Sequence, residues 1–144
     1  MTRAGALDRI DALLSTITDP PFAAVVRAEP LAISGTPVVA VWVSARTPGW
    51  QTLSNTGSTT TIMVRAYFRM QPAEVVRESI EEDVWDAMVE IDTKLRSDAN
   101  LAGNVTDSVV GPAQVQYLTM GDAVFRVATI PFDVQILEEV DITP

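Results

Sequence analysis

The side chains in this sequence that could do chemistry are carboxylates, and they are densest between residues 81 and 92. Glu81, Glu82 and Asp86 stand there with three further acids. Two carboxylates brought together can hydrolyse a glycoside or hold Mg²⁺. Their positions, however, are those of the exposed side of an amphipathic helix. The pattern therefore favours a solvated face over a functional acidic surface, and a functional acidic surface over catalysis.

Other catalytic chemistries lack the residue types they need. The chain has no histidine and no cysteine, which removes Ser-His-Asp and Cys-His nucleophiles, cysteine-bound zinc and the usual general base near neutral pH. Neither G-x-x-x-x-G-K-[ST] nor G-x-G-x-x-G occurs, so no phosphate-binding loop is indicated. We therefore expect a protein that is not an enzyme, with no catalytic, cofactor-binding or metal-ligating residue and no cofactor.

The composition indicates one globular domain over residues 1–144, with 47% hydrophobic and 20% charged residues. The net charge of −9 argues against a grip on DNA, because affinity for nucleic acid comes mostly from Lys and Arg. The chain could still surround DNA without binding it. Its start is charged rather than apolar, and no apolar run reaches the ~18–20 residues of a membrane span. We expect a protein made in a cytoplasm, without membrane contact.

Hydrophobic periodicity divides the chain into helices and strands. Two amphipathic helices are predicted over residues 4 to 17 and 73 to 97. Strands are predicted over residues 22 to 29, 37 to 45 and 60 to 70, and two or three more over residues 105 to 119 and 122 to 138, with a hairpin turn at Gly121-Asp122 and a polar connection over residues 46 to 60. Short connections favour antiparallel neighbours, and each helix has one apolar stripe. The fold class is therefore α+β, a mainly antiparallel sheet of about five strands with two helices packed on one face.

The strands carry more apolar side chains than two helices can cover. Residues 38 to 43 are all apolar, and in the last strand Phe125 and Val127 lie on the opposite face from most of its other apolar residues. A monomer would expose this second set, and large exposed apolar patches mark association sites. We favour self-association. The alternatives are a bulge at Pro131 that shifts the phase, or residues 46 to 60 folding over the sheet.

The tryptophans have different surroundings in the sequence. Trp42 and Trp85 fall in apolar surroundings, Trp42 in an apolar strand and Trp85 beside the apolar stripe of a helix, and are predicted to be core residues. Trp50 stands with Leu53 in the polar connection, where it either anchors the connection to its own domain or contacts a partner, since Trp is enriched at binding hot spots.

One pair of arginines also has a distinctive position. Arg65 and Arg69 share a strand face with Tyr67, and they could pair with acids of a neighbouring subunit.

The order of these elements resembles that of the tail terminator, or tail completion, proteins of bacteriophages with long non-contractile tails. The resemblance covers most of the chain and is one of pattern. The segments that carry it are Leu7 to Ile17, Thr60 to Arg69, Ala73 to Leu95, the Leu-x-Gly-x-Val turn from Leu101 to Val105, and Phe125 to Glu138.

The resemblance implies a virion structural protein that forms a ring, usually of six identical subunits. Such a ring caps the tail tube, ends its polymerisation and joins the tail to the head-completion proteins. Its partners would be its own copies, the tail tube protein and a head-completion or connector protein, while DNA passes through without specific binding. It would be assembled in the host cytoplasm and end in the virion tail. The candidate contact residues are Trp50, Leu53, Phe125 and Val127, and a possible acidic face toward the lumen is formed by Glu81, Glu82 and Asp86.

Two other functions stay open at this point. Head-tail connector proteins and tail tube proteins have small α+β domains that look alike from sequence. A small-molecule-binding or enzymatic domain that uses the acidic helix is a different class, which a convergent pocket with a raised carboxylate pKa would support.

Overall fold

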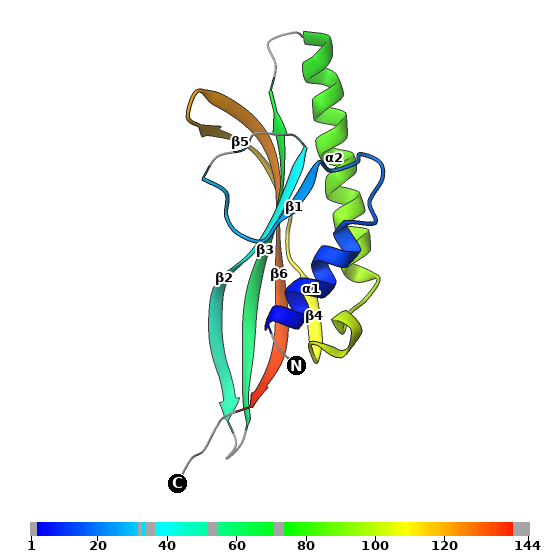
Figure 1. Ribbon diagram of the computed structural model, residues 1–144. Coiled ribbons are helices and arrows are strands. Elements are labelled where there is room, and N and C mark those ends of the chain that lie inside the picture. Colours follow the sequence, from blue (N-terminus) through cyan, green and yellow to red (C-terminus); the bar gives the residue numbers. More distant parts are fainter. Residues whose placement is uncertain (1–2, 32, 34–36, 52–54, 71–73, 140–144) are drawn as a thin grey trace.

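A computed structural model describes residues 3–31, 33, 37–51, 55–70 and 74–139. Two helices and six strands follow one another along the chain (Figure 1). Their bounds are α1 (Arg3–Leu14), β1 (Ala24–Val26), β2 (Val38–Gln51), β3 (Asn55–Arg69), α2 (Glu74–Arg96), a 3-10 turn (Leu101–Gly103), β4 (Asp107–Val110), β5 (Gln114–Met120) and β6 (Ala123–Glu139). The predicted α+β class is confirmed.

The six strands form one sheet in the order β1-β2-β3-β6-β4, and β5 also pairs with β6. Every pair is antiparallel except β1 with β2, which is parallel. β6 pairs with β3 along its whole length, and its other edge pairs with β5 near its start and with β4 further on. The predicted strand region over residues 105 to 119 is thus two strands, separated by residues 111 to 113.

Both helices pack on the same face of the sheet, as predicted (Figure 1). The main core lies between them and that face. On α2, buried side chains recur every three or four residues at Val84, Ala87, Ile91 and Leu95, which is the stripe of an amphipathic helix that covers a sheet. Lys94 and Arg96 lie in its last turn, where positive charge is favourable for the helix dipole.

The prediction of a polar connection over residues 46 to 60 was wrong. Residues 46–51 continue β2 and residues 55–60 begin β3, so that the two strands form a long hairpin with Arg46 opposite Thr60 and Pro48 opposite Ser58. β-branched threonines suit this extended pairing, and the register shifts between Val43 and Ala45. Trp50 therefore belongs to β2, and Leu53 lies outside the described residues.

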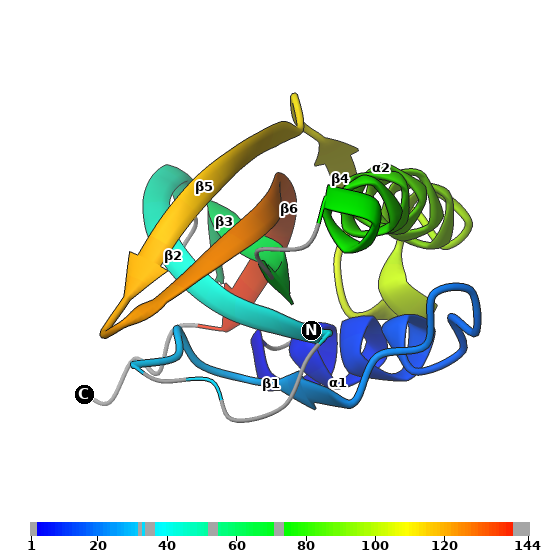
Figure 2. The ribbon, with the colours of Figure 1, turned by 90° about the horizontal axis from the view of Figure 1, so that it is seen from above.

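The hairpin and the end of β6 make a three-stranded arm that extends beyond the helices at the lower end of Figure 1. At the opposite end, β5 and β6 are joined at Gly121-Asp122, the predicted hairpin turn, with Met120 paired to Ala123. Gly121 has a φ of 61°, a conformation that glycine adopts without strain. Figure 2 shows this second hairpin bending away from the two helices.

Candidate interaction surfaces

Glu81, Glu82 and Asp86 all lie on α2, but they do not share one environment. Glu81 points toward the sheet, where it accepts two hydrogen bonds from Arg126 of β6, each 2.9 Å long. It also accepts a hydrogen bond from the indole nitrogen of Trp85 at 3.1 Å. Glu82 and Asp86 are exposed. The predicted acidic face therefore consists of Glu82 and Asp86, while Glu81 is held by a cation of its own chain.

The carboxylate of Glu81 is poorly suited to acid catalysis. A hollow of about 320 Å³ lies beside it, lined by Met70, Arg77, Glu78, Glu81 and Tyr117. The hydrogen bonds from Arg126 lower the pKa of Glu81 below its usual value, against the opposing effect of burial. A general acid needs the opposite, a pKa raised toward neutrality. The arrangement stabilises the charged form of Glu81 and ties α2 to β6.

The contact of Arg126 with Glu81 and Tyr117, on the helix side of the sheet, was not predicted from the sequence. The Arg126 guanidinium carbon lies 4.4 Å from the ring centroid of Tyr117 on β5, and the side chain of Arg126 is only 15% exposed. A signal was present, since Arg126 interrupts an otherwise apolar face of its strand. A charge at such a position requires a partner of opposite sign, and the acidic residues of the predicted helix were the candidate partners.

The outer side of α2 carries two exposed apolar side chains. Trp85 is 47% exposed and Val89 is 58% exposed, so the prediction of Trp85 as a core residue was wrong. Trp85 follows the buried Val84 by one position, which is about 100° around a helix, and this turns its ring out of the core. We call the patch formed by Glu82, Trp85, Asp86 and Val89 the helix surface.

Phe125 and Val127, expected to be exposed in a monomer, are 1% and 0% exposed. They belong to a second buried cluster with Ala40 and Tyr67, on the side of the sheet away from the helices. Partly buried side chains packed against this cluster are Val26, Ile33, Trp42, Leu118, Met120 and Ala123. The expectation was wrong because the bent β5–β6 hairpin and the segment after β1 cover this part of the sheet.

The rest of that side of the sheet is not covered in the same way. Three rows across β2, β3 and β6 lie below the second cluster, with Trp42 beside Met63 and Met63 beside Pro131 in the middle row. These side chains are half-buried, and both helices lie on the other face (Figure 1). We call this region the open face; its residues are Trp42, Thr61, Met63, Arg65, Pro131 and Asp133.

Arg65 is the cation of the open face. Its guanidinium carbon lies 5.3 Å from the ring centroid of Trp42 and 5.9 Å from that of Tyr67. Its Nε donates to Oγ1 of Thr129 at 2.8 Å. Among the described residues it has no carboxylate partner, because Asp133, the acid of this face, accepts a 2.6 Å hydrogen bond from Thr61 instead. Two rings and a hydroxyl thus hold a half-buried guanidinium in place.

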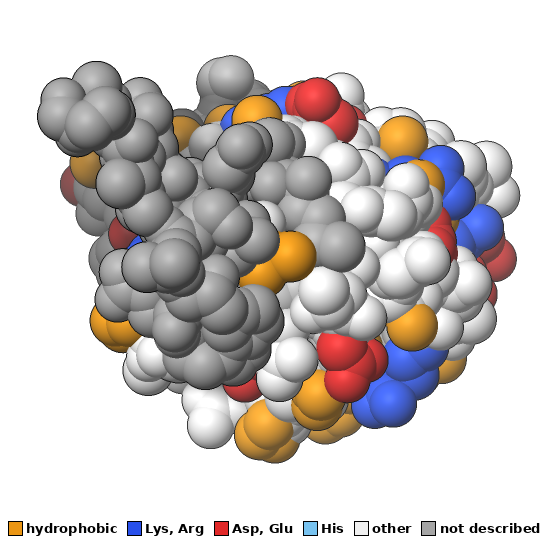
Figure 3. Space-filling view, turned by 90° about the horizontal axis from the view of Figure 1, so that it is seen from below, with side chains coloured by type: hydrophobic (Ala, Val, Ile, Leu, Met, Phe, Trp, Pro, Cys, Tyr) orange, Lys and Arg blue, Asp and Glu red, His pale blue; other side chains and the backbone are white. Residues whose placement is uncertain are grey.

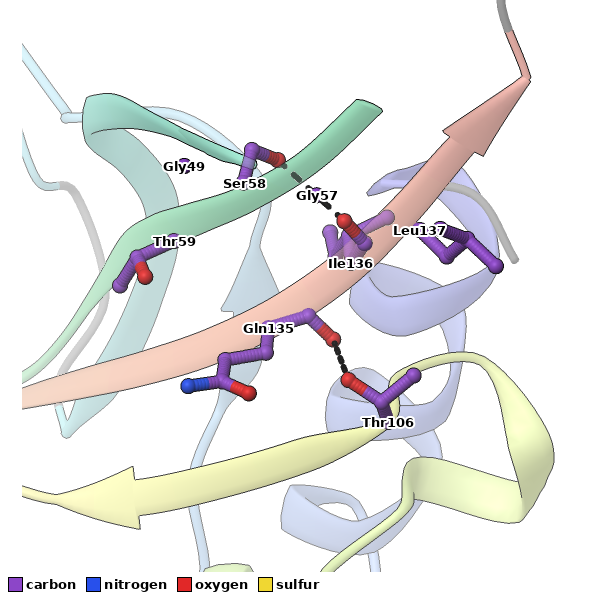
Figure 4. A pocket seen from close by; sticks show the side chains of 8 residues that line it. All are labelled: Gly49, Gly57, Ser58, Thr59, Thr106, Gln135, Ile136 and Leu137. Atoms are coloured by element: carbon purple, nitrogen blue, oxygen red, sulfur yellow. Dashed lines mark hydrogen bonds between the residues drawn. The ribbon is translucent and has the colours of Figure 1, made fainter. Parts of the chain in front are cut away.

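A second hollow lies in the arm, and it is uncharged. It measures about 290 Å³ and is lined by Gly49, Gly57, Ser58, Thr59, Thr106, Gln135, Ile136 and Leu137 (Figure 4). Thr106 donates to the backbone oxygen of Gln135 at 3.0 Å, and Ser58 donates to that of Ile136 at 3.5 Å. The hydroxyls of Ser58 and Thr106 thus bind the backbone of the neighbouring strand β6.

Seen from below, the described hydrophobic side chains form small separate groups among polar atoms (Figure 3). Acidic and basic side chains lie next to one another on the same end. This end therefore differs from the helix surface, where apolar side chains adjoin charge of one sign.

Two further features of the described residues bear on classification. They include no group of three or more His, Cys, Asp or Glu placed to hold a metal ion. No helix in the described part of the chain combines the length and apolar character needed to cross a membrane.

No family model and no curated protein matches the chain.

Proposed function

We propose that this chain is a structural subunit of a phage tail, of the tail terminator type. Copies of the chain would form a closed ring, expected to have six members, that caps the tail tube, ends its growth and joins it to a head-completion protein. DNA would pass through the ring without being bound. The protein would be assembled in the host cytoplasm and remain in the virion.

The observation that carries the proposal is the open face. A sheet with apolar side chains on both faces needs cover on both, yet α1 and α2 cover one face and the second cluster covers only part of the other. Trp42, Met63 and Pro131 are left half-buried beside Arg65. Such a face supports a role in assembly.

The net charge of −9 supports passage of DNA without capture. Phosphates are repelled by a surface rich in carboxylates, and binding to DNA depends on cations that replace its counterions. An acidic ring would therefore let the DNA slide. The order of elements, with α2 between the central strands β3 and β6, agrees with the resemblance described above.

The proposal is tested on virus particles from which this chain has been deleted. We expect tails of variable and excessive length that are not joined to filled heads, measured by electron microscopy of negatively stained lysates. Supplying the intact chain should restore uniform tails. Joined tails of normal length in its absence would refute the proposed function.

A further inference from the structure

We propose that the subunit contact of the ring is made by the helix surface of one copy packing on the open face of the next. The inference rests on the proposed function in one respect, that the chain assembles with itself. It goes further by naming both surfaces, Glu82, Trp85, Asp86 and Val89 on one side and the rows around Trp42, Met63 and Arg65 on the other.

The layers of the fold favour this contact. Within one copy the order is helices, sheet and open face, with helical cover on one side only (Figure 1). Within β2, residues Val38 to Val43 place apolar side chains on both faces of the sheet. An α2 helix from a second copy would supply the missing helical layer, so that each sheet lies between its own helices and those of a neighbour.

Each of the two surfaces has a short row of apolar side chains. Trp85 and Val89 are four residues apart, so they lie one above the other on one side of α2. The row from Trp42 through Met63 to Pro131 crosses three adjacent strands, which are about 4.8 Å apart. An exposed indole can pack against such a row, and Trp is enriched at binding hot spots, which cluster near the centre of interfaces.

Glu82 and Asp86 of the helix surface have the opposite charge to Arg65 of the open face, whose own acid, Asp133, is hydrogen-bonded to Thr61. Glu82 and Asp86 flank Trp85 on the helix surface and are exposed. Arg65 lies in the row next to Trp42, held between two rings with no carboxylate partner among the described residues. A fixed guanidinium binds a carboxylate with little loss of conformational freedom. For a chain with a net charge of −9, such a local attraction is what offsets the general repulsion between copies.

The placement of the two surfaces determines the kind of assembly. They lie on opposite sides of the sheet (Figure 1), so two copies cannot satisfy both contacts within one symmetric dimer. The contact is head-to-tail, and such contacts run on until they close in a ring. Glu82 and Asp86 are thereby assigned to the subunit contact rather than to the lumen.

Charge reversal on each surface tests the contact. Arg65→Glu makes the open face acidic, and Glu82→Arg with Asp86→Arg makes the helix surface basic. We expect each variant alone to associate at least about tenfold more weakly than the wild type, the scale of losing one anchoring interaction. Association is measured by sedimentation at concentrations up to about 1 mM, the weak limit of specific binding.

Mixing the two variants gives the sharper result. In an equimolar mixture, the acidic open face meets a basic helix surface, and the unchanged open face meets an unchanged helix surface. Association should return, in species larger than dimers in which the two variants alternate. A mixture that stops at dimers would show that helix surfaces pair with each other, which overturns the inference.

Controls separate this contact from general charge effects and from misfolding. Asp19→Arg with Asp122→Arg changes the net charge by the same amount at two exposed sites, and it should leave association unchanged. Trp85→Ala should keep the wild-type thermal stability while weakening association, because the indole is half exposed.

The remaining outcomes are distinguishable from failure of the proposed function. If the wild type and both charge variants all form rings, the contact lies elsewhere. That result would overturn this inference and leave the proposed tail role intact. A wild type that stays monomeric at every concentration would overturn it too. Only normal tails in particles without the chain would refute the function itself.

Discussion

Arg126 and Glu81 join the last strand to the long helix through two parallel hydrogen bonds. Nε of Arg126 donates to Oε2 and Nη2 donates to Oε1, each at 2.9 Å. Paired bonds of this kind fix the orientation of both side chains. They hold the middle of α2, beside Trp85, which donates to the same carboxylate.

Removing this cation should destabilise the fold measurably. Arg126→Leu leaves the partly buried Glu81 carboxylate without its donor, and we expect a loss of about 1.5–3 kcal/mol in the free energy of unfolding. Urea denaturation provides the measurement. The matched control is Arg96→Leu, because Arg96 pairs with Asp92 but is 62% exposed, and should cost less than about 0.5 kcal/mol. Equal losses from the two variants would contradict the structural role of Arg126.

A buried hydroxyl in β3 offers a stabilising substitution. Thr60 is fully buried, and its Oγ1 has no hydrogen-bond partner among the described residues. Thr60→Val keeps the shape and removes the unsatisfied group, so we expect stability to rise by about 1 kcal/mol, or roughly 2–4 °C in Tm. Thr59→Val, on the other face of the strand and half-buried, should have a smaller effect. A lower Tm for Thr60→Val would show that the hydroxyl is paired.

The break between β4 and β5 depends on a glycine. A Cβ at Gly111 would lie 2.8 Å from Cγ and 3.1 Å from the backbone oxygen of Pro131, while the Gly111 N–H donates to that same oxygen at 2.8 Å. We expect Gly111→Ala to cost about 1–3 kcal/mol through overpacking. In a double-mutant cycle, Pro131→Ala should recover part of this loss, because it removes the closest atom. Strict additivity of the two losses would argue against the close approach.

Acid should weaken the fold through its paired carboxylates. The hydrogen bond from Arg9 at 2.7 Å lowers the pKa of Asp98, and Arg126 lowers that of Glu81. Because both folded-state pKa values lie below the unfolded ones, their stabilisation is complete above the unfolded values and is lost as pH falls through the folded ones. The urea midpoint should therefore drop between about pH 5 and about pH 2. Asp98→Asn should flatten this dependence; an unchanged slope would contradict it.

The parts of the fold that depend on local pattern were predictable from sequence. The stripe of Val84, Ala87, Ile91 and Leu95 identified α2, and Gly121-Asp122 identified the hairpin. Both signals depend only on residues that are close together in the sequence. Residues 46 to 60 were misread because Thr, Ser and Gly also make loops. What turns them into strands is pairing, with Thr60 opposite both Arg46 and Val134, and that pairing is not visible locally.

The candidate surfaces were harder to predict than the fold. Two-sided apolar strands indicated a second face, but Phe125 and Val127 lie on the bent β5–β6 hairpin and are buried with Ala40 and Tyr67. Curvature of a sheet is a three-dimensional property that alternation alone does not encode. Trp42 and Arg65 border the buried cluster, and with Met63 they stay half-buried on the same side of the sheet.

The position of β6 in the chain has a consequence for synthesis on the ribosome. β6 borders β3, β4 and β5, yet it is translated after all three of them, and residue 55 pairs with residue 139. Pairings between distant residues form slowly, because a long loop has to close first. Until β6 emerges, β3 has an unpaired edge beside the apolar side chains of Ile62 and Val64. An unfinished chain thus exposes a strand edge prone to aggregation. This edge of β3 is covered only when β6 has paired with it.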